Sequence, residues 1–439
     1  MLVALLAVLA CLPPTVVSSG DGPDDLPVIS TGYVISQEVN GTAATNYTTG
    51  EVEFISNDTA WVVQSVIDAL YASGGNILFT KGDFTLTRAL RIDVPVTLIG
   101  AGNGLFNGSY AYGTRLCFNK TDGGIVVNSG LEQFDFGLTI RDLAIDGQAI
   151  AAVGLNMVKA SRCVFENVAF LHFTEYGVWL QEAHLNCFRG CHFIWNGPDS
   201  PLHGGLRIGY HSSANANSFW GCSFEWGGSG AIIMNSYSCT FESCTFEGNN
   251  YHGLYGFSDP ANSSYAQHVT VDGCYFELNN IARSKGLICD VLIEGAGSGF
   301  WSIQDIKTAG ELVKYSIWTD GWYTYLKNVR PMDRTVYWNT IYGTLDTVER
   351  LDPSCLPLSS TVVKNGTGLV AEGTVVMPAG SSSAEVATGL ISQAMNVQVI
   401  GTSEETSCLW ITDNVPGSFM INAPAALTAD QVIYWRASV

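Results

Sequence analysis

Three glutamates recur at one position of a repeating pattern in the middle of the sequence: Glu225, Glu247 and Glu277. Each directly follows a Phe that is expected to point inward from a strand, so the glutamate is expected on the outer face. On stacked strands, neighbouring members would have backbones about 4.8 Å apart and the outer two roughly 10 Å apart. These spacings bracket the carboxyl separations of retaining (about 5 to 5.5 Å) and inverting (about 6.5 to 9.5 Å) glycosidases. The row is therefore compatible with hydrolysis of a glycosidic bond.

Stacked like charges raise one another's pKa, which would keep one carboxyl of the row protonated near neutral pH. We assign Glu247 as the general acid and Glu225 as its partner. Two other interpretations stay open. The row is either a set of solvated glutamates without chemistry or a ladder of oxygen ligands that suits calcium.

Residues that suit sugars surround this row in the expected coils. Aromatic rings stack on sugar faces by apolar contact, and polar side chains orient hydroxyl groups. Each such residue taken singly is more often structural, so the cluster is the stronger indication of glycan binding. The expected substrate-binding residues are His192, Trp195, His203, Trp226, His252 and Tyr255.

Other chemistries find less support in the sequence. A pectate-lyase mechanism needs a basic residue as proton acceptor, and Arg207 is the one candidate near the acidic row. Arg141, Glu166 and Arg189 align instead in an outward column that predicts a salt-bridge ladder. The chain lacks a phosphate loop, a supported Ser/His/Asp arrangement and zinc-type Cys/His spacing, so no metal centre is expected.

The elements that would position these residues follow from a pattern of the form apolar-x-x-apolar-x-apolar. A period in the low twenties with insertions is typical of a solenoid of parallel strands. The second and third apolar residues of each set share a face and point inward. The six sets are Ile140/Leu143/Ile145, Phe165/Val168/Phe170, Phe188/Cys191/Phe193, Phe219/Cys222/Phe224, Phe241/Cys244/Phe246 and Val271/Cys274/Phe276.

These sets predict a column of stacked Phe beside a column rich in Cys, which packs as a small apolar side chain when buried. Most of the 12 cysteines are accordingly expected as free thiols, with bridging of neighbouring thiols as the alternative. A second strand is expected to begin at a corner glycine in four coils, at Gly177, Gly205, Gly230 and Gly253. Insertions are expected over residues 195–204 and 256–268, and insertions in solenoids cluster on the binding face.

A capping helix is expected ahead of the coils, over residues 60–72, with its N-cap in Asn57-Asp58-Thr59 and its end at Gly74-Gly75. The run from residue 58 to 104, with DTAWVVQSVIDAL, GGNILFTKGDFTL and VTLIGAG, resembles the N-terminal module of the pectate-lyase superfamily. With the coils, the resemblance covers about residues 57–280. It implies an all-β fold, a right-handed parallel β-helix, and a homotrimer as in viral tailspikes. It leaves the chemistry open, because the superfamily contains lyases, hydrolases, epimerases and adhesins without catalysis.

The expected organisation has five segments. An apolar stretch resembles a secretory signal without its basic start, and it is alternatively an uncleaved segment that anchors the chain in an assembly. Two prolines indicate a linker, and alternating segments after it predict a small β-sandwich that resembles those ending viral fibres. The segments are 1–19 (signal-like or anchoring), 20–56 (extension), 57–350 (β-helix), 351–362 (linker) and 363–439 (sandwich).

Composition restricts the partners. The formal net charge is -20, from 20 Lys and Arg against 40 Asp and Glu. A nucleic-acid partner is therefore not expected, because such proteins need a basic surface. Seven Asn-x-Ser/Thr sequons allow glycosylation of a secreted chain.

Together these features favour an extracellular or virion-surface spike or adhesin that binds cell-surface glycans or receptors. The first alternative is a tailspike-like polysaccharide hydrolase or lyase that uses the glutamate row. The second alternative is a purely structural component of a particle or surface layer.

Overall fold

The fold is seen in a computed structural model that describes most of the chain. The described residues are 32–106, 109–110, 112–128, 136–209, 212–258, 265–295, 297–332, 334–338, 342–348, 361–363, 370–387, 396–401, 409–415 and 418–438. The signal-like segment 1–19 and nearly all of the expected linker lie outside them.

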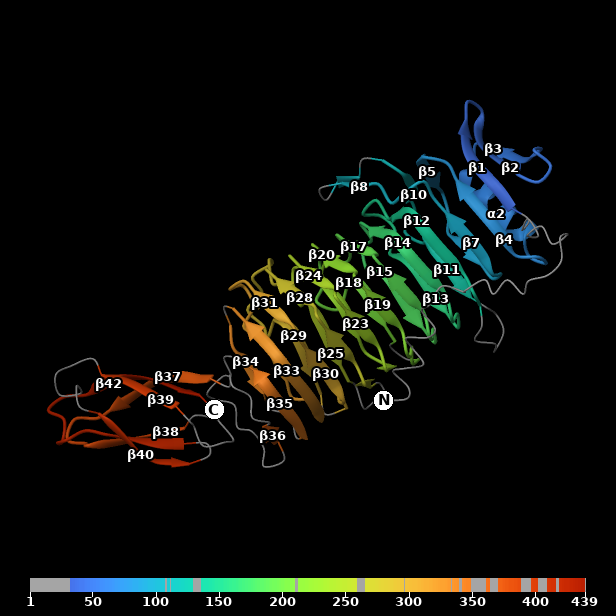
Figure 1. Cartoon of the computed structure of the whole chain (residues 1–439). Helices are drawn as coiled ribbons and strands as arrows, with labels where there is room; N and C mark the ends of the chain where they lie inside the picture. Colours follow the sequence, from blue (N-terminus) through green and yellow to red (C-terminus); the bar gives the residue numbers. More distant parts are fainter. Residues whose placement is uncertain are drawn as a thin grey trace, which may run out of the picture.

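The described part of the chain begins with a small antiparallel meander, β1 (Gly32–Glu38), β2 (Gly41–Asn46) and β3 (Val52–Ser56). Strand β1 also pairs in parallel with β4 (Gly75–Phe79), so the meander is continuous with the sheet that follows. Between them lies the single described helix, α2 (Thr59–Ala69), at the N-terminal end of the long stack of coils (Figure 1).

The expected capping helix is confirmed, with shifted ends. The Asp58 side chain accepts a hydrogen bond from the Trp61 amide, as an N-cap residue does. The apolar face of α2 is buried against the meander and the first coils, which closes the end of the solenoid. The helix ends earlier than expected, at Ala69, because the chain already turns at Leu70. Gly74 follows at φ +64° and donates its amide to the Leu70 carbonyl oxygen.

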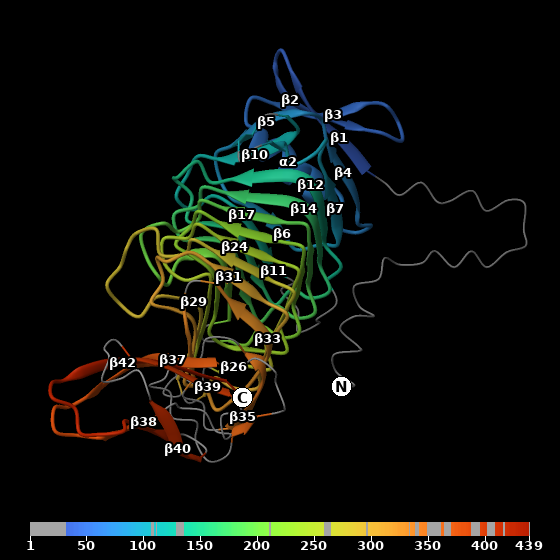
Figure 2. The same cartoon turned by 60° about the vertical axis from the view of Figure 1, so that its left-hand side comes forward.

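Parallel strands then stack coil upon coil into two walls, which confirms the predicted parallel β-helix (Figures 1 and 2). The second wall has ten strands. They are β6 (Leu90–Ile92), β11 (Ile125–Asn128), β13 (Val153–Val158), β15 (Tyr176–Gln181), β18 (Gly204–Ile208), β21 (Ser229–Ile233), β25 (Leu254–Phe257), β29 (Cys289–Glu294), β32 (Tyr315–Thr319) and β34 (Val336–Trp338).

The first wall belongs to a 22-stranded sheet that includes the meander and β4. Most of its later coils contribute two short strands separated by a bend. Its other strands are β5 (Gly82–Leu86), β7 (Val96–Ile99), β10 (Thr114–Phe118), β12 (Thr139–Asp146), β14 (Val164–Leu171), β16 (Cys187–Arg189), β17 (His192–Ile194), β19 (Ser218–Trp220), β20 (Ser223–Glu225), β23 (Thr240–Glu242), β24 (Thr245–Glu247), β27 (Thr270–Asp272), β28 (Tyr275–Glu277), β30 (Trp301–Gln304), β31 (Lys307–Ala309), β33 (Tyr323–Pro331), β35 (Tyr342–Val348) and β36 (Thr361–Val363).

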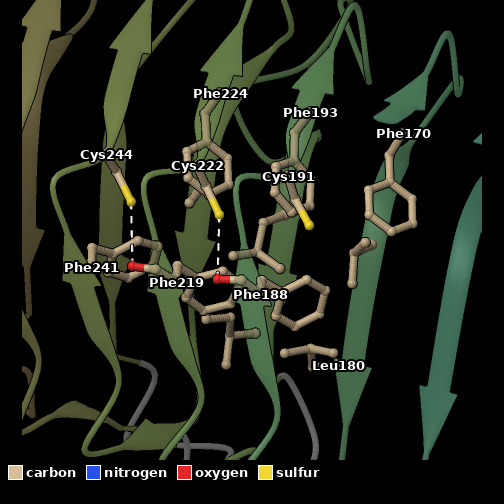
Figure 3. Close-up of a cluster of buried hydrophobic side chains, with 14 of the residues drawn as sticks. Phe170, Leu180, Phe188, Cys191, Phe193, Phe219, Cys222, Phe224, Phe241 and Cys244 are labelled. Carbon is tan, nitrogen blue, oxygen red and sulfur yellow. Dashed lines mark hydrogen bonds between the residues drawn. The ribbon is translucent and has the colours of Figure 1, made fainter. Parts of the chain in front are cut away.

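All six predicted sets stand in register, and all their apolar residues are buried. In the Phe column, the ring of Phe224 stacks on Phe193 at 4.5 Å between centroids (Figure 3). On its other side it stacks on Phe246 at 4.8 Å. The thiols of the neighbouring column do not bridge. They donate to carbonyls of the preceding coil, as Cys222 does to Phe188 at 3.5 Å, and the nine described cysteines are free and buried.

The four predicted glycines occupy equivalent positions of the second wall. The reason for glycine there is not the sharp corner that was expected. None has a positive φ. A Cβ added to Gly205 would lie 2.8 Å from the Gly230 carbonyl oxygen of the next coil and 2.8 Å from the Phe193 Cβ. Glycine is needed there because the coils approach too closely for a side chain.

The C-terminal region contains two three-stranded antiparallel sheets, β37 (Val370–Met377), β42 (Gln431–Ser438) and β39 (Asn396–Gly401), and β38 (Ser383–Ala387), β41 (Ser418–Asn422) and β40 (Trp410–Val415). The viral-fibre-like sandwich and the domain boundaries stay predictions. Two pairs of two-residue strands complete the described strands, β8 (Leu105–Phe106) with β9 (Ser109–Tyr110), and β22 (Ser236–Tyr237) with β26 (Ala266–Gln267). No helix in the described part of the chain is long and apolar enough to span a membrane.

Candidate functional site

The three glutamates form a row on the outer face of the first wall. Glu225 pairs in register with Glu247, and Glu247 pairs with Glu277, on strands β20, β24 and β28. All three side chains are half-buried. Next to the row, the Tyr275 hydroxyl donates to Glu277 Oε2 at 2.8 Å. The row is therefore a continuous acidic strip rather than three isolated charges.

Glu247 is the middle carboxyl of the row and has an acidic neighbour on each side. Partial burial, followed by the charges of Glu225 and Glu277, raises the pKa of Glu247 above its ordinary value. Among the described residues, no group of three or more His, Cys, Asp or Glu side chains converges in a geometry that would hold a metal ion. The row thus raises the pKa of its middle carboxyl, and its calcium interpretation gains no geometric support within the described residues.

A pocket of about 450 Å³ lies beside the wall, where successive coils turn toward the second wall. It is formed by the turns after β12, β14, β17 and β20, and by the predicted insertion between β17 and β18. Trp226 is 43% exposed, and its indole lies over Gly248 of the next coil. The residues that line the pocket are Ala149, His172, Phe173, Thr174, Trp195, Pro198, Asp199 and Trp226.

Two side-chain amides hold the walls of this pocket. The Asn196 side chain accepts from the Phe173 amide at 3.0 Å and donates to the Phe170 carbonyl at 2.9 Å, which ties two coils together beneath the pocket. The inserted loop is fixed from the other side, because the Asn250 side chain donates to the Pro198 carbonyl at 2.8 Å. The pocket is therefore preformed by hydrogen bonds between coils.

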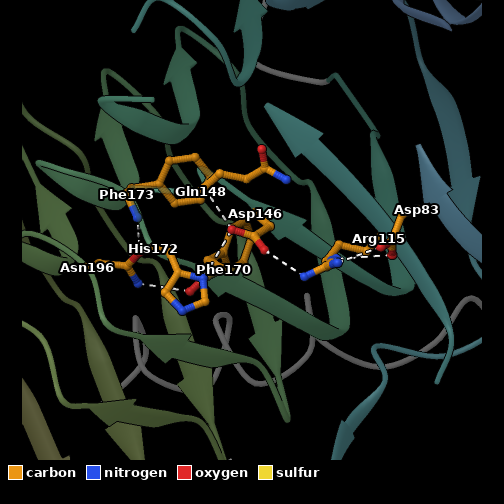
Figure 4. A network of polar contacts seen from close by, with 8 residues as sticks. All are labelled: Asp83, Arg115, Asp146, Gln148, Phe170, His172, Phe173 and Asn196. Atoms are coloured by element: carbon orange, nitrogen blue, oxygen red, sulfur yellow. Dashed lines mark hydrogen bonds and ion pairs between the residues drawn. The ribbon is translucent and has the colours of Figure 1, made fainter. Parts of the chain in front are cut away.

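A chain of charged groups ends at this pocket. His172 Nδ1 lies 3.1 Å from Asp146 Oδ1, and Asp146 Oδ2 lies 3.1 Å from the Arg115 guanidinium, which also pairs with Asp83 (Figure 4). The Gln148 amide donates to Asp146 Oδ1 at 2.8 Å. The imidazole of His172 stacks on the Trp195 indole at 4.9 Å with 3° between the planes.

The protonation of Asp146 follows from these partners. Burial by itself would raise its pKa, but the hydrogen bonds from His172 and the Gln148 amide, with the Arg115 charge, lower it below the usual value. An ionised Asp146 can only accept, so Nδ1 of His172 carries the hydrogen of this contact. In the neutral imidazole, Nε2 is then a hydrogen-bond acceptor.

Sequence reasoning missed His172 and Asp146 as site residues, although Asp146 occupies the same outward column as the glutamates. The signal was present: His172 and Trp195 each stand two residues after the inward Phe of consecutive coils, and both have positive φ. A shared position in adjacent coils predicts stacking, as observed.

The predicted sugar-binding residues do not form one cluster. Trp195 and Trp226 line the pocket, whereas His192 lies in the wall with Nδ1 2.9 Å from the Ser223 hydroxyl, and burial lowers its pKa. His203, on the insertion, packs edge-on against Tyr176 at 5.2 Å.

His252 and Tyr255 are nearly fully buried in the second wall. His252 Nδ1 accepts from the Cys289 amide at 3.2 Å, and burial lowers its pKa to about 4. The Tyr255 hydroxyl donates to Glu294 Oε2 at 2.7 Å, and burial with this carboxylate raises its pKa. Their observed contacts are internal to the chain.

Two expectations about arginines were wrong. Arg207 lies on β18 in the second wall, where its guanidinium sits over the rings of Tyr176 and Trp179 rather than beside the glutamates. The salt-bridge ladder does not form either: in the described part of the chain, no ion pair joins Arg141, Glu166 and Arg189. The Arg189 guanidinium instead packs over the Trp220 indole of the next coil, at 5.1 Å.

Comparisons with known proteins agree with this architecture. Residues 138–301 match the family model described as the right handed beta helix region. No match to a curated protein sequence was found. The solved structure of ORF18 from Geobacillus virus E2 aligns with a TM-score of 0.51 and 16% identity, covering 84% of this chain and 74% of that chain.

Two further solved structures are similar at lower scores. An alginate lyase from Paenibacillus sp. str. FPU-7 aligns with a TM-score of 0.46 and 16% identity, covering 64% of this chain and 97% of that chain. The tailspike gp49 of Acinetobacter baumannii bacteriophage Fri1, a capsular polysaccharide depolymerase, aligns with a TM-score of 0.40 and 11% identity, covering 87% of this chain and 82% of that chain. The family match and the viral structure confirm the right-handed parallel β-helix predicted from the sequence.

Proposed function

We propose that this chain is a spike- or adhesin-type protein of a virion or cell surface, and that it binds glycans at the turns where the pocket lies. The observation that carries the proposal is the pair of indoles, Trp195 and Trp226, that line a preformed pocket beside an inserted loop. Indole faces stack on the apolar faces of sugar rings, and the polar groups at the rim provide hydrogen bonds to hydroxyls.

The elongated wall of the β-helix adds surface on which a longer glycan can extend. Trp226 directly follows Glu225, so a chain bound over the indole would run onto the glutamate row. The viral and polysaccharide-acting proteins with similar folds are compatible with this proposal, but the pocket geometry carries it.

Replacing Trp226 by alanine tests the proposal. Binding to an array of bacterial and cell-surface polysaccharides should weaken by about 1 kcal/mol or more, which is roughly fivefold or more, because one stacking face is lost. The matched control is Trp61→Ala, since Trp61 is 44% exposed on α2, away from the pocket. Equal affinities of the wild type and the Trp226 variant for every bound glycan would refute binding at this pocket.

A second function is favoured by the acidic strip: hydrolysis of the bound polysaccharide with Glu247 as general acid and Glu225 as its partner. The raised pKa of Glu247 is the observation in its favour, because a general acid must hold its proton near the working pH. Glu277, on the other side, would be the alternative partner.

The change Glu247→Gln keeps the shape of the side chain and removes the proton donor. If the strip is catalytic, loss of polysaccharide viscosity should slow by at least about a hundredfold. Glu242→Gln, on the exposed neighbouring column, should leave the rate unchanged. Equal rates for the Glu247 variant and the wild type would exclude this chemistry, and binding to no glycan would favour the purely structural role.

A further inference from the structure

The pocket beside the insertion has an unusual balance of charge and aromatic surface. Asp199 is the one acidic or basic side chain, apart from His172, among the residues that line it. The Asp199 carboxylate is exposed, and within the described residues no hydrogen bond or ion pair of this side chain is found. The remaining walls are rings or small side chains, so the pocket offers a carboxylate and aromatic faces, and no Lys or Arg is among its lining residues.

The groups behind the wall add negative charge. Asp83, Arg115 and Asp146 together carry a formal charge of -1, and they hold His172 with its Nδ1 hydrogen directed to Asp146. With a net charge of -20 for the whole chain, the local field favours a positively charged ligand.

The aromatic walls complete this match. Elsewhere in the protein, Arg189 and Arg207 lie over the rings of Trp220 and Trp179. Within the described part of the chain, no Lys or Arg covers Trp195 or Trp226. One face of the Trp195 indole is covered by the His172 imidazole, and the Trp226 indole lies over Gly248. Because Trp226 is 43% exposed, its other face is open to a ligand, and the negative face of an indole attracts an ammonium group.

We propose that this pocket selects glycans that carry a protonated amino group, meaning amino sugars with a free amine, over N-acetylated or uronate sugars. The ammonium group pairs with the Asp199 carboxylate and the indole face of Trp226. A uronate would place a further negative charge beside Asp199 and Asp146, with no Lys or Arg among the lining residues to receive it. This inference rests on the proposed glycan binding and names its substrate class.

The test compares three oligosaccharides of equal length by calorimetry at pH 6 and about 0.15 M salt: oligomers of glucosamine, of N-acetylglucosamine and of galacturonate. The glucosamine oligomer should bind at least about tenfold more tightly than the acetylated one, since a desolvated cation over an aromatic face with a carboxylate partner contributes on that scale. The galacturonate oligomer should bind most weakly.

Two matched substitutions separate the pocket from the general charge of the protein. Asp199→Asn should remove most of the preference for the free amine. Glu51→Gln removes an equal charge at an exposed position between β2 and β3, away from the pocket, and should leave the preference unchanged. Equal effects of the two substitutions would mean that the preference reflects net charge alone, and the proposal would fail.

The outcomes also separate this inference from the proposed function. Trp226-dependent binding with equal affinity for the free and acetylated amines would overturn the substrate class while glycan binding stands. If neither the glucosamine oligomer nor the N-acetylglucosamine oligomer binds, the substrate class is likewise overturned. The polysaccharide array then decides whether the pocket binds glycans at all.

Discussion

At the residue scale, side-chain chemistry alternates sharply between the inside and the outside of the coil. Phe224 points inward into a stack of rings, while Glu225 beside it and Trp226 after it reach the outer face and the pocket. A single residue step thus separates a position that stabilises the solenoid from one that can contact a ligand. Substitutions at neighbouring positions should accordingly have different effects.

The variant Phe224→Ala should be destabilised by about 3 to 5 kcal/mol, because a fully buried ring between two stacked rings is lost and a cavity remains. The same change at Phe300, which is 39% exposed, should cost much less, on the order of 1 kcal/mol. Chemical denaturation of both variants measures the difference. Similar losses would contradict the stacking account.

His252 predicts a pH dependence of stability. Its pKa of about 4 in the folded chain lies below the ordinary His value of about 6.5, so the unfolded chain binds the proton first as pH falls. The neutral His252 therefore makes its full contribution to the free energy of unfolding above about pH 6.5. This contribution is lost progressively as the pH falls to about 4, a change on the order of 3 kcal/mol.

Urea unfolding at pH 7 and pH 4 measures this loss. The variant His252→Asn keeps an acceptor for the Cys289 amide but does not titrate, so its stability should fall less between the two pH values. If the variant loses as much stability between pH 7 and pH 4 as the wild type does, groups other than His252 cause the acid sensitivity.

At the element scale, the coil depends on bends that suit particular residue types. The bend between the two short strands of the first wall is left-handed in successive coils, with φ between +53° and +61°. Asp, Asn, Ser and Gly fill it. Glycine, Asn and Asp tolerate this conformation better than other residues, which explains the residue types inside the apolar-x-x-apolar pattern. The bend residues are Asp142, Asn167, Gly190, Gly221, Ser243 and Gly273.

The glycine column of the second wall makes a separate prediction. Gly205→Ala should destabilise the protein by about 1 to 3 kcal/mol, because the added methyl group meets the Gly230 carbonyl and Phe193 at 2.8 Å. Gly286→Ala adds the same group in open space and should change stability by less than about 0.5 kcal/mol. Thermal unfolding compares the two variants. Comparable melting temperatures would show that the coils can move apart.

At the scale of the whole molecule, the β-helix is an elongated stack of coils that is followed by the C-terminal sheets (Figure 1). The resemblance to tailspikes predicts that three chains associate. Light scattering should then give the mass of three chains. Because each chain carries a net charge of -20, mutual repulsion should be screened by salt, and the trimer should persist to lower protein concentration at high ionic strength. A stable monomer under all conditions would count against the spike interpretation.

The coil, its register and the cap could all be predicted from the order of the residues. Alternation with a period of two is a local property, so the pattern alone placed Phe188, Cys191 and Phe193 inside, and Glu225 and Glu247 side by side outside. The apolar face of α2 and the insertion before Gly204 were equally local signals.

Which side chains meet at the turns depends instead on how the coils pack. Asp146, His172 and Trp226 come from three different coils, and their meeting depends on the length and bend of every intervening turn. Burial of His252 and stacking of Arg189 on Trp220 depend in the same way on lateral neighbours. The row of glutamates and the stacking of His172 on Trp195 were therefore predictable, because equivalent positions of adjacent coils stack. The pocket beside the row was not, because periodicity does not determine how turns of different length close over one another.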